Sequence, residues 1–284
     1  MNSESATESC RYSLEAGELA QWNRDGYFVR ENVFTAEEND AIRQAAEDVV
    51  VGDRAFPSAH MDRNALVTDG KEERKGIYGM HKIHHPSCYL TAFLDRARDE
   101  RLTDPLLDVL GSDILGINNL FIWKAPEIGL GFPWHQDKFY FRRRFTTETT
   151  VGTWTAIDPA DRDNGCLYVI PGSHKWDIRE HDDLDGSQQK EFKLARGVRD
   201  EDGVPVEIPP GAVIWFHSHL LHKSTDNHSQ RFRRCYVIHY LSAQAEWADP
   251  GLAGRRGQPV MWIRGRTFPG KVCEVERTVL SILE

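Results

Sequence analysis

The chain has 284 residues, of which 40% are hydrophobic and 10% aromatic, so it can bury a core and is not intrinsically disordered. Its 35 Lys and Arg against 44 Asp and Glu give a formal charge of −9, which disfavours a nucleic-acid-binding protein. Five cysteines without a CxxC pair argue against a disulfide framework or zinc ribbon and favour a reducing compartment. We see no secretory signal and no apolar run that could span a membrane, so we expect a cytoplasmic protein without membrane attachment.

The first hundred or so residues are predicted to be helical. Thr35-Ala-Glu-Glu38 has the pattern of a capping box, in which the Thr and Glu side chains satisfy free amides of the first turn. Behind it, apolar residues recur at helical spacing: Ile42, Ala45, Ala46, Val49 and Val50. A second helix is expected over 90–97. A third is expected to begin at Asp104-Pro105, as N-cap and first residue, and to end before Gly111.

Two regions differ from this helical part. Residues 52–82 show no clear period, and we expect a long loop there, which in a compact domain is usually functional. From about residue 115, short β-rich runs alternate with turn residues, at roughly 117–125, 149–158, 165–171, 204–209, 212–218, 231–243 and 259–264.

The order of helices and then strands predicts an α+β fold. Its core would be a double-stranded β-helix, a jelly roll of cupin-like type, over about 115–265, with the N-terminal helices of about 13–111 packed on one sheet. No linker divides the chain, so 1–284 is expected to form a single domain.

Histidine and aspartate are paired as His-x-Asp at residues 60–62, 135–137 and 181–183, and chance alone supplies about one such pair. The pair at 135–137 lies in the aromatic stretch 132–141, which could enclose a water-poor pocket. On a strand, residues i and i+2 share a face, so this pair could aim both side chains at one ion. We interpret the other two pairs as structural or surface residues.

Two histidines and one carboxylate can hold Fe(II) on one face and leave positions open for substrate and oxygen. Three later histidines could supply the third ligand: His217, His219 and His222. Three arginines beyond them could bind a carboxylate through a bidentate guanidinium: Arg231, Arg233 and Arg234. Strand alternation does not choose among the histidines, because His217 and His219 share parity and His222 could lie past a bend. It does not choose among the arginines either, because both faces of their segment continue in apolar residues.

Three motifs together resemble the phytanoyl-CoA dioxygenase family of Fe(II)/2-oxoglutarate oxygenases. They are Trp134-His-Gln-Asp137; Asn164–Lys175, preceded by Trp154–Asp158; and His222–Arg234, which runs into His239-Tyr240. The segment around Asp25–Arg30 also resembles the start of that family. The resemblance extends from about residue 18 to 243.

The resemblance implies His135, Asp137 and His222 as ligands of Fe(II), with 2-oxoglutarate and O2 as cosubstrates. Arg233, eleven residues after His222, would bind the distal carboxylate of 2-oxoglutarate together with Ser224. Further contacts to the cosubstrate would come from three residues: Trp154, Leu120 and Lys82. Lys124 is a rival to Lys82 for the lysine position.

The function implied is oxidation of an unactivated C–H bond of a small organic substrate, without a catalytic side chain beyond the iron ligands. Hydroxylation is the simplest outcome, but desaturation, epoxidation, ring closure and epimerisation use the same oxidant. Asp137 argues against halogenation, because related halogenases lack a carboxylate there. The acidic charge and the absence of a peroxisomal C-terminal signal favour natural-product tailoring over acyl-CoA hydroxylation.

A non-catalytic jelly-roll protein that binds a metal or ligand is the alternative from another class. Four residues near the metal motif are expected in the substrate pocket: Trp134, Gln136, Phe139 and Arg142.

Overall fold

The computed structural model describes residues 10–147, 149–183, 193–249 and 259–272. The helices are α1 (Ala16–Asp25), α2 (Ala36–Val51), α3 (Ala65–Thr68), α4 (Thr91–Arg98), α5 (Glu100–Leu110) and α6 (Asp137–Phe141). Short 3₁₀ turns lie at Ser58–His60, Gly76–Gly79, Pro86–Cys88, Ser173–Lys175 and Asp200–Asp202. In the part of the chain that is described, no helix has the length and apolarity needed to span a bilayer.

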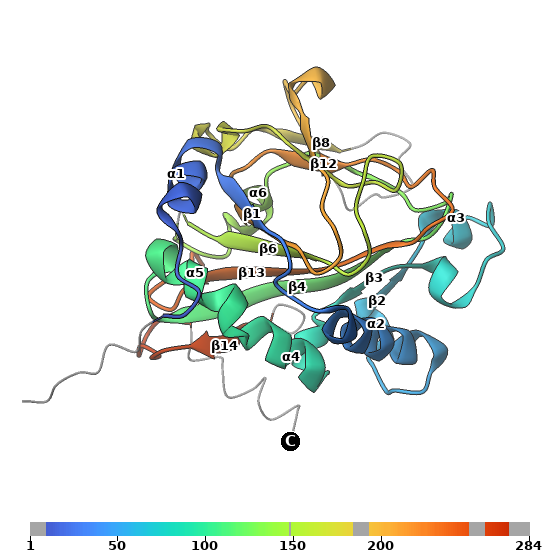
Figure 1. Cartoon of the computed structure of the whole chain (residues 1–284), viewed down its shortest axis with the longest axis horizontal. Helices are drawn as coiled ribbons and strands as arrows, with labels where there is room; N and C mark the ends of the chain where they lie inside the picture. The colour runs from blue at the N-terminus through green and yellow to red at the C-terminus, as the bar shows by residue number, and fades with distance from the viewer. Residues whose placement is uncertain (1–9, 148, 184–192, 250–258, 273–284) are drawn as a thin grey trace, which may run out of the picture.

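A large antiparallel sheet forms one layer (Figure 1), with the strand order β1-β11-β6-β13-β4-β3-β2 and with β14 paired to β4. Its strands are β1 (Tyr27–Arg30), β2 (Met61–Arg63), β3 (Met80–His84), β4 (Ile114–Lys124), β6 (Val151–Ala156), β11 (Val213–His217), β13 (Arg233–Ser242) and β14 (Met261–Arg264). A smaller sheet, ordered β10-β7-β12-β5, lies across from it. It contains β5 (Phe132–His135), β7 (Leu167–Val169), β10 (Val204–Val206) and β12 (His222–Ser224), while β8 (His181–Asp183) and β9 (Lys193–Ala195) form a hairpin. The expected jelly-roll core is confirmed.

Helices α2, α4 and α5 cover the outer face of the large sheet (Figure 1), as expected. The capping box that begins α2 is present: the Thr35 side chain accepts from the Glu38 amide, and the Glu38 carboxylate accepts from the Thr35 amide. Buried side chains of these helices pack against the outward-facing side chains of β13, such as Tyr236 and Ile238.

The start predicted for α5 is wrong. The helix begins at Glu100, because the Asp99 side chain caps it, and Pro105 lies inside it. An interior proline costs about 3 kcal/mol or more. Each of the leucines that continue the buried stripe across it, Leu102, Leu106 and Leu110, contributes about 1.5–3 kcal/mol on burial. The packing therefore outweighs the lost backbone bond.

The prediction of a loop over 52–82 is also wrong. This segment contains β2 and the start of β3, which extend the large sheet beyond β4. Both strands are short, three and five residues, so no alternation was visible in the sequence. The consequence for the site is that Lys82 and His84 are carried on a strand of the barrel wall.

Candidate metal centre and anion-binding cavity

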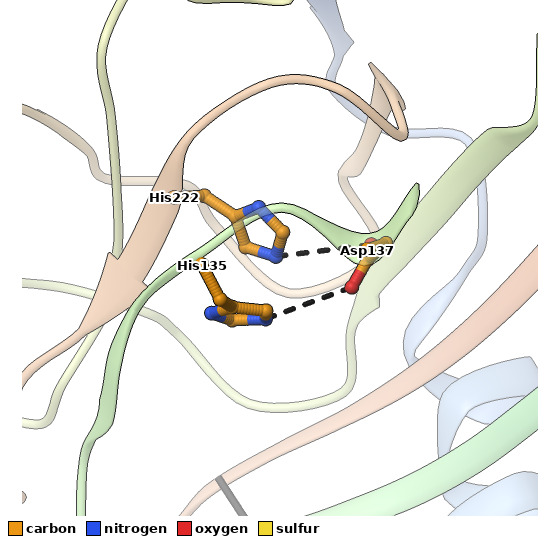
Figure 2. A group of neighbouring side chains, drawn as sticks. All are labelled: His135, Asp137 and His222. Atoms are coloured by element: carbon orange, nitrogen blue, oxygen red, sulfur yellow. Dashed lines mark ion pairs between the residues drawn. The ribbon is translucent and has the colours of Figure 1, made fainter. Parts of the chain in front are cut away.

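Three potential metal ligands come together where two strands of the small sheet meet. His135 ends β5, His222 begins β12, and the two residues are direct partners in the antiparallel pairing. Asp137 is not on a strand but is the first residue of α6. Gln136 before it is extended, with φ −120° and ψ 125°, which keeps Asp137 on the side of His135. One ligand atom of each residue lies within 4.8 Å of the others, and no other such trio occurs in the described residues (Figure 2).

Backbone carbonyls fix the orientation of both imidazoles. His135 Nδ1 donates to the Pro133 carbonyl at 2.8 Å, and His222 Nδ1 donates to the Leu220 carbonyl at 3.0 Å. A carbonyl only accepts, so the proton must be on Nδ1 and the lone pair on Nε2. Both Nε2 atoms face Asp137, at 3.6 Å from Oδ1 for His135 and 3.8 Å from Oδ2 for His222 (Figure 2).

The charge state of the trio suits a cation. Burial, and then His222, lowers the pKa of His135 to about 3, so this imidazole is neutral at neutral pH. Burial by itself raises the pKa of Asp137. The combined effect of His239, His222 and His135 is larger and lowers this pKa below its ordinary value, so the carboxylate is ionised. The group therefore offers imidazole nitrogens and one anionic oxygen, a set that binds Fe(II), Zn(II) or related metals.

His239 on β13 supports the carboxylate from the other sheet. Its Nε2 lies 2.8 Å from Asp137 Oδ2, and its Nδ1 lies 3.4 Å from the Asn118 amide nitrogen. Since one carboxylate oxygen is bound in this way, the orientation of Asp137 is fixed before any metal arrives.

A cavity of about 260 Å³ opens between the sheets beside the trio. Arg233 lines it and is 1% exposed. Its Nη1 contacts the Cys235 thiol at 3.0 Å, its Nε has no partner, and no carboxylate pairs with it within the described residues. Burial lowers the pKa of this guanidinium. Burying an unpaired charge is costly, so the cavity is suited to an anionic ligand.

The sequence matches the phytanoyl-CoA dioxygenase (PhyH) family over residues 22–235. The chain belongs to the phytanoyl-CoA dioxygenase family.

Relatives in this family match to different extents. A phytanoyl-CoA dioxygenase domain-containing protein 1 homolog of Caenorhabditis elegans is 26% identical over 81% of this chain and 92% of its own length. A probable alpha-ketoglutarate-dependent hypophosphite dioxygenase of Stutzerimonas stutzeri is 27% identical over 89% of this chain and 88% of its own length. The human peroxisomal phytanoyl-CoA dioxygenase is 33% identical, but over 49% of this chain and 43% of its own length. The chain thus matches less than half of that enzyme.

Solved structures share the fold. EctD from S. alaskensis, with 2-oxoglutarate and 5-hydroxyectoine, superposes with a TM-score of 0.68 at 21% identity, over 90% of this chain and 88% of EctD. EvdO2 from Micromonospora carbonacea var. aurantiaca, complexed with 2-oxoglutarate, gives a TM-score of 0.65 at 24% identity, over 84% of this chain and 94% of EvdO2.

Most of the residues that the family resemblance singled out lie together. Five of them line the cavity with the trio: Lys82, Leu120, Trp154, Ser224 and Arg233. The guanidinium of Arg233 lies 5.4 Å from the Trp154 ring. Lys124 does not line the cavity. It is fully buried, and its Nζ donates to Ser224 Oγ at 2.7 Å.

Four expected pocket residues do not line this cavity. Trp134 and Gln136 flank His135 in extended backbone and so face away from it. The Trp134 indole donates to Asp200 at 2.6 Å, and the Gln136 amide donates to the His219 carbonyl at 2.8 Å.

The other two lie on or just after α6. Phe139 stacks on His181 at 4.0 Å, and Arg142 lies over the Phe139 ring at 3.8 Å. Helix α6 turns these side chains away from the cavity, whereas the sequence had suggested a strand only for the pair at 135–137.

Several cavity residues were not predicted for the site, among them His84, Asn118 and His239. On β13, Arg233, Val237 and His239 lie on the same face of the strand, and all three line the cavity. Strand alternation starting from Arg233 could therefore have predicted His239 as a cavity residue. No such signal existed for His84, because its short strand was not recognised.

Proposed function

We propose that the protein is an Fe(II)/2-oxoglutarate-dependent dioxygenase that hydroxylates an unactivated C–H bond of a small organic substrate. One observation carries the proposal: a buried His-Asp-His trio and a buried guanidinium without a carboxylate partner line the same cavity. A chelating keto acid with a second carboxylate needs both features. The names of the relatives, which include an alpha-ketoglutarate-dependent dioxygenase, support it.

The residues fit the metal. His135, Asp137 and His222 would hold Fe(II), since their Nε2 atoms face a buried, ionised carboxylate. When bound, Fe(II) supplies with 2-oxoglutarate and O2 the oxidising chemistry, and the protein supplies orientation. Arg233 and Ser224 would bind the distal carboxylate of 2-oxoglutarate. Leu120 and Trp154 would exclude water beside it, and Lys82 would add a positive charge at the cavity wall.

We propose a substrate of the natural-product tailoring type. A cavity of about 260 Å³ suits a small molecule better than an extended surface partner. The structural neighbours include EctD with 5-hydroxyectoine and the epimerase SnoN with nogalamycin RO, which supports small-molecule chemistry of this kind.

Anaerobic titration tests the proposal. Fe(II) and 2-oxoglutarate together should give the charge-transfer absorbance of a metal-chelated keto acid in the wild-type protein. His222→Ala should abolish it, and Arg233→Ala should raise the 2-oxoglutarate concentration needed by roughly tenfold or more, since a charged hydrogen-bond partner is lost.

The exposed His228, outside the cavity, gives a matched control, and His228→Ala should titrate as wild type does. The proposal is wrong if His222→Ala and Arg233→Ala bind both ligands with unchanged affinity. After oxygen is admitted with substrate, succinate should accumulate; a lasting absorbance without succinate across a substrate panel would favour a non-catalytic binding protein.

A further inference from the structure

Lys124 and Arg233 form a buried pair of basic side chains. They are direct partners across β4 and β13, and they are 0% and 1% exposed. Within the described residues, neither forms an ion pair with a carboxylate. Like charges directly opposite each other in a sheet are destabilising, and more so away from water. We therefore expect such a pair to have a function, and the adjacent cavity, which is suited to an anionic ligand, indicates which one.

Two glycines leave room for the lysine. A Cβ at Gly129 would lie 2.5 Å from Lys124 Cβ, and a Cβ at Gly165 would lie 3.0 Å from Lys124 Nζ. Gly165 also has φ +87°, which few other residues adopt. The backbone therefore closes around Lys124 at both ends of its side chain, and its ammonium group has a defined position.

That position determines the hydrogen bonding of Ser224. Lys124 Nζ donates to Ser224 Oγ at 2.7 Å and also to the Thr225 carbonyl. The protonated amine has no acceptor, so in that state the Ser224 hydroxyl accepts here and must donate its own proton elsewhere. Ser224 lines the cavity. Its proton is thus available to a ligand that carries an acceptor, such as a carboxylate.

The electrostatics agree with this arrangement. Burial, and then Arg233, lowers the pKa of Lys124 well below its ordinary value. An anion in the cavity would oppose both effects, because it would stabilise the charged form of the amine. Ligand charge and lysine charge therefore stabilise each other.

We propose that Lys124 is a positioning residue that fixes Ser224 as a hydrogen-bond donor and, together with Arg233, makes the cavity selective for keto acids that carry a second carboxylate. This inference rests on the proposed function. It gives Lys124 a role distinct from that of Lys82, which lines the cavity and pairs with Asp62 at 3.4 Å.

The test compares two keto acids on the anaerobic Fe(II) protein. 2-Oxoglutarate and 2-oxopentanoate chelate metal through the same end, but only the first has a distal carboxylate, and charge-transfer absorbance reports both affinities. Lys124→Met should reduce the preference of wild type for 2-oxoglutarate by roughly ten- to a hundredfold, with little change for 2-oxopentanoate. Equal weakening of both acids would mean a merely structural role and overturn the inference.

Two further variants complete the design. Lys175→Met removes a surface lysine that donates to the Arg24 carbonyl, and it should leave the preference unchanged. If Lys124→Met does not fold, Lys124→Gln keeps an amide donor without the charge and should also reduce the preference.

A double-mutant cycle tests the route through the serine. The double variant Ser224→Ala/Lys124→Met should lose less of the preference for 2-oxoglutarate, as a free energy, than the two single variants lose in sum. The reason is that the two residues act on one carboxylate. Strict additivity would contradict that route. If wild type itself binds no 2-oxoglutarate, the proposed function fails; if wild type prefers 2-oxoglutarate and Lys124→Met keeps that preference, only the inference fails.

Discussion

His239 shows at the residue scale how one side chain prepares a metal centre from the opposite sheet. Its hydrogen bond to Asp137 Oδ2 leaves the other carboxylate oxygen toward His135 Nε2, at 3.6 Å. Asn118 lies against the far side of the His239 ring. Partners of metal ligands typically account for ten- to a hundredfold in metal affinity.

We therefore expect His239→Ala to weaken Mn(II) binding by about ten- to a hundredfold without unfolding the protein. Mn(II) is a redox-stable stand-in for Fe(II), and calorimetric titration measures its affinity directly. His228→Ala again serves as the surface control. Unchanged Mn(II) affinity in His239→Ala would show that Asp137 needs no support from β13.

At the scale of elements, the hairpin of β2 and β3 carries one side of the cavity. Asp62 on β2 lies directly opposite Lys82 on β3 and also contacts His84 Nε2 at 2.7 Å. Burial by itself raises the pKa of Asp62, but the bond to His84 and the charge of Lys82 lower it to about 2. The sequence indicates structural or surface roles for the His60–Asp62 pair. In the structure, Asp62 contacts two residues of the cavity wall, Lys82 and His84.

This shift predicts a pH dependence of stability. A depressed carboxyl pKa stabilises the fold above the unfolded value, and the contribution is lost as the pH falls through the folded value. The Asp62 side chain is 34% exposed, so we discount the full shift to about 1 kcal/mol. Asp62→Asn should lower the free energy of unfolding in urea by about 1 kcal/mol at neutral pH.

The difference in unfolding free energy between Asp62→Asn and wild type should become smaller as the pH falls from about 4 to about 2. Over this range the Asp62 carboxylate of the wild-type protein becomes protonated. Asp183→Asn, at a residue 77% exposed and paired with Lys193, should have almost no effect at any pH. If Asp62→Asn instead lowers the free energy of unfolding by the same amount at every pH, Asp62 contributes through its shape and not through its charge.

β13 shows at the same scale why some sequence patterns were uninformative. Its two faces are both apolar because one packs under the helices while the other, with Arg233 and His239, faces the cavity. Alternation separates buried from solvated faces, and here neither face is solvated.

At the scale of the whole molecule, the site joins the two sheets. His135 and His222 belong to the small sheet, whereas Arg233 and His239 belong to the large one. A metal and a keto acid held between them would connect both layers. Ligands that bind only the folded state raise its stability by mass action.

Mn(II) and 2-oxoglutarate, each at about a hundred times its dissociation constant, should therefore raise the melting temperature by roughly 5–10 °C. Scanning calorimetry measures the shift. Arg233→Ala should keep the part due to Mn(II) and lose the part due to 2-oxoglutarate. A shift from 2-oxoglutarate that persists in Arg233→Ala would place its carboxylate elsewhere.

The sequence by itself determined the secondary structure with strong local signals, such as the capping box of α2, and it determined the chemistry available: imidazoles, a carboxylate and guanidinium groups in ordered motifs. Only the tertiary structure decided which faces meet. It carried Pro105 inside α5, made strands of part of residues 52–82, turned Gln136 and Phe139 away from the cavity, and placed Lys124 opposite Arg233. These outcomes depend on contacts between residues far apart in the chain, whereas periodicity and motif spacing record only what neighbouring residues do.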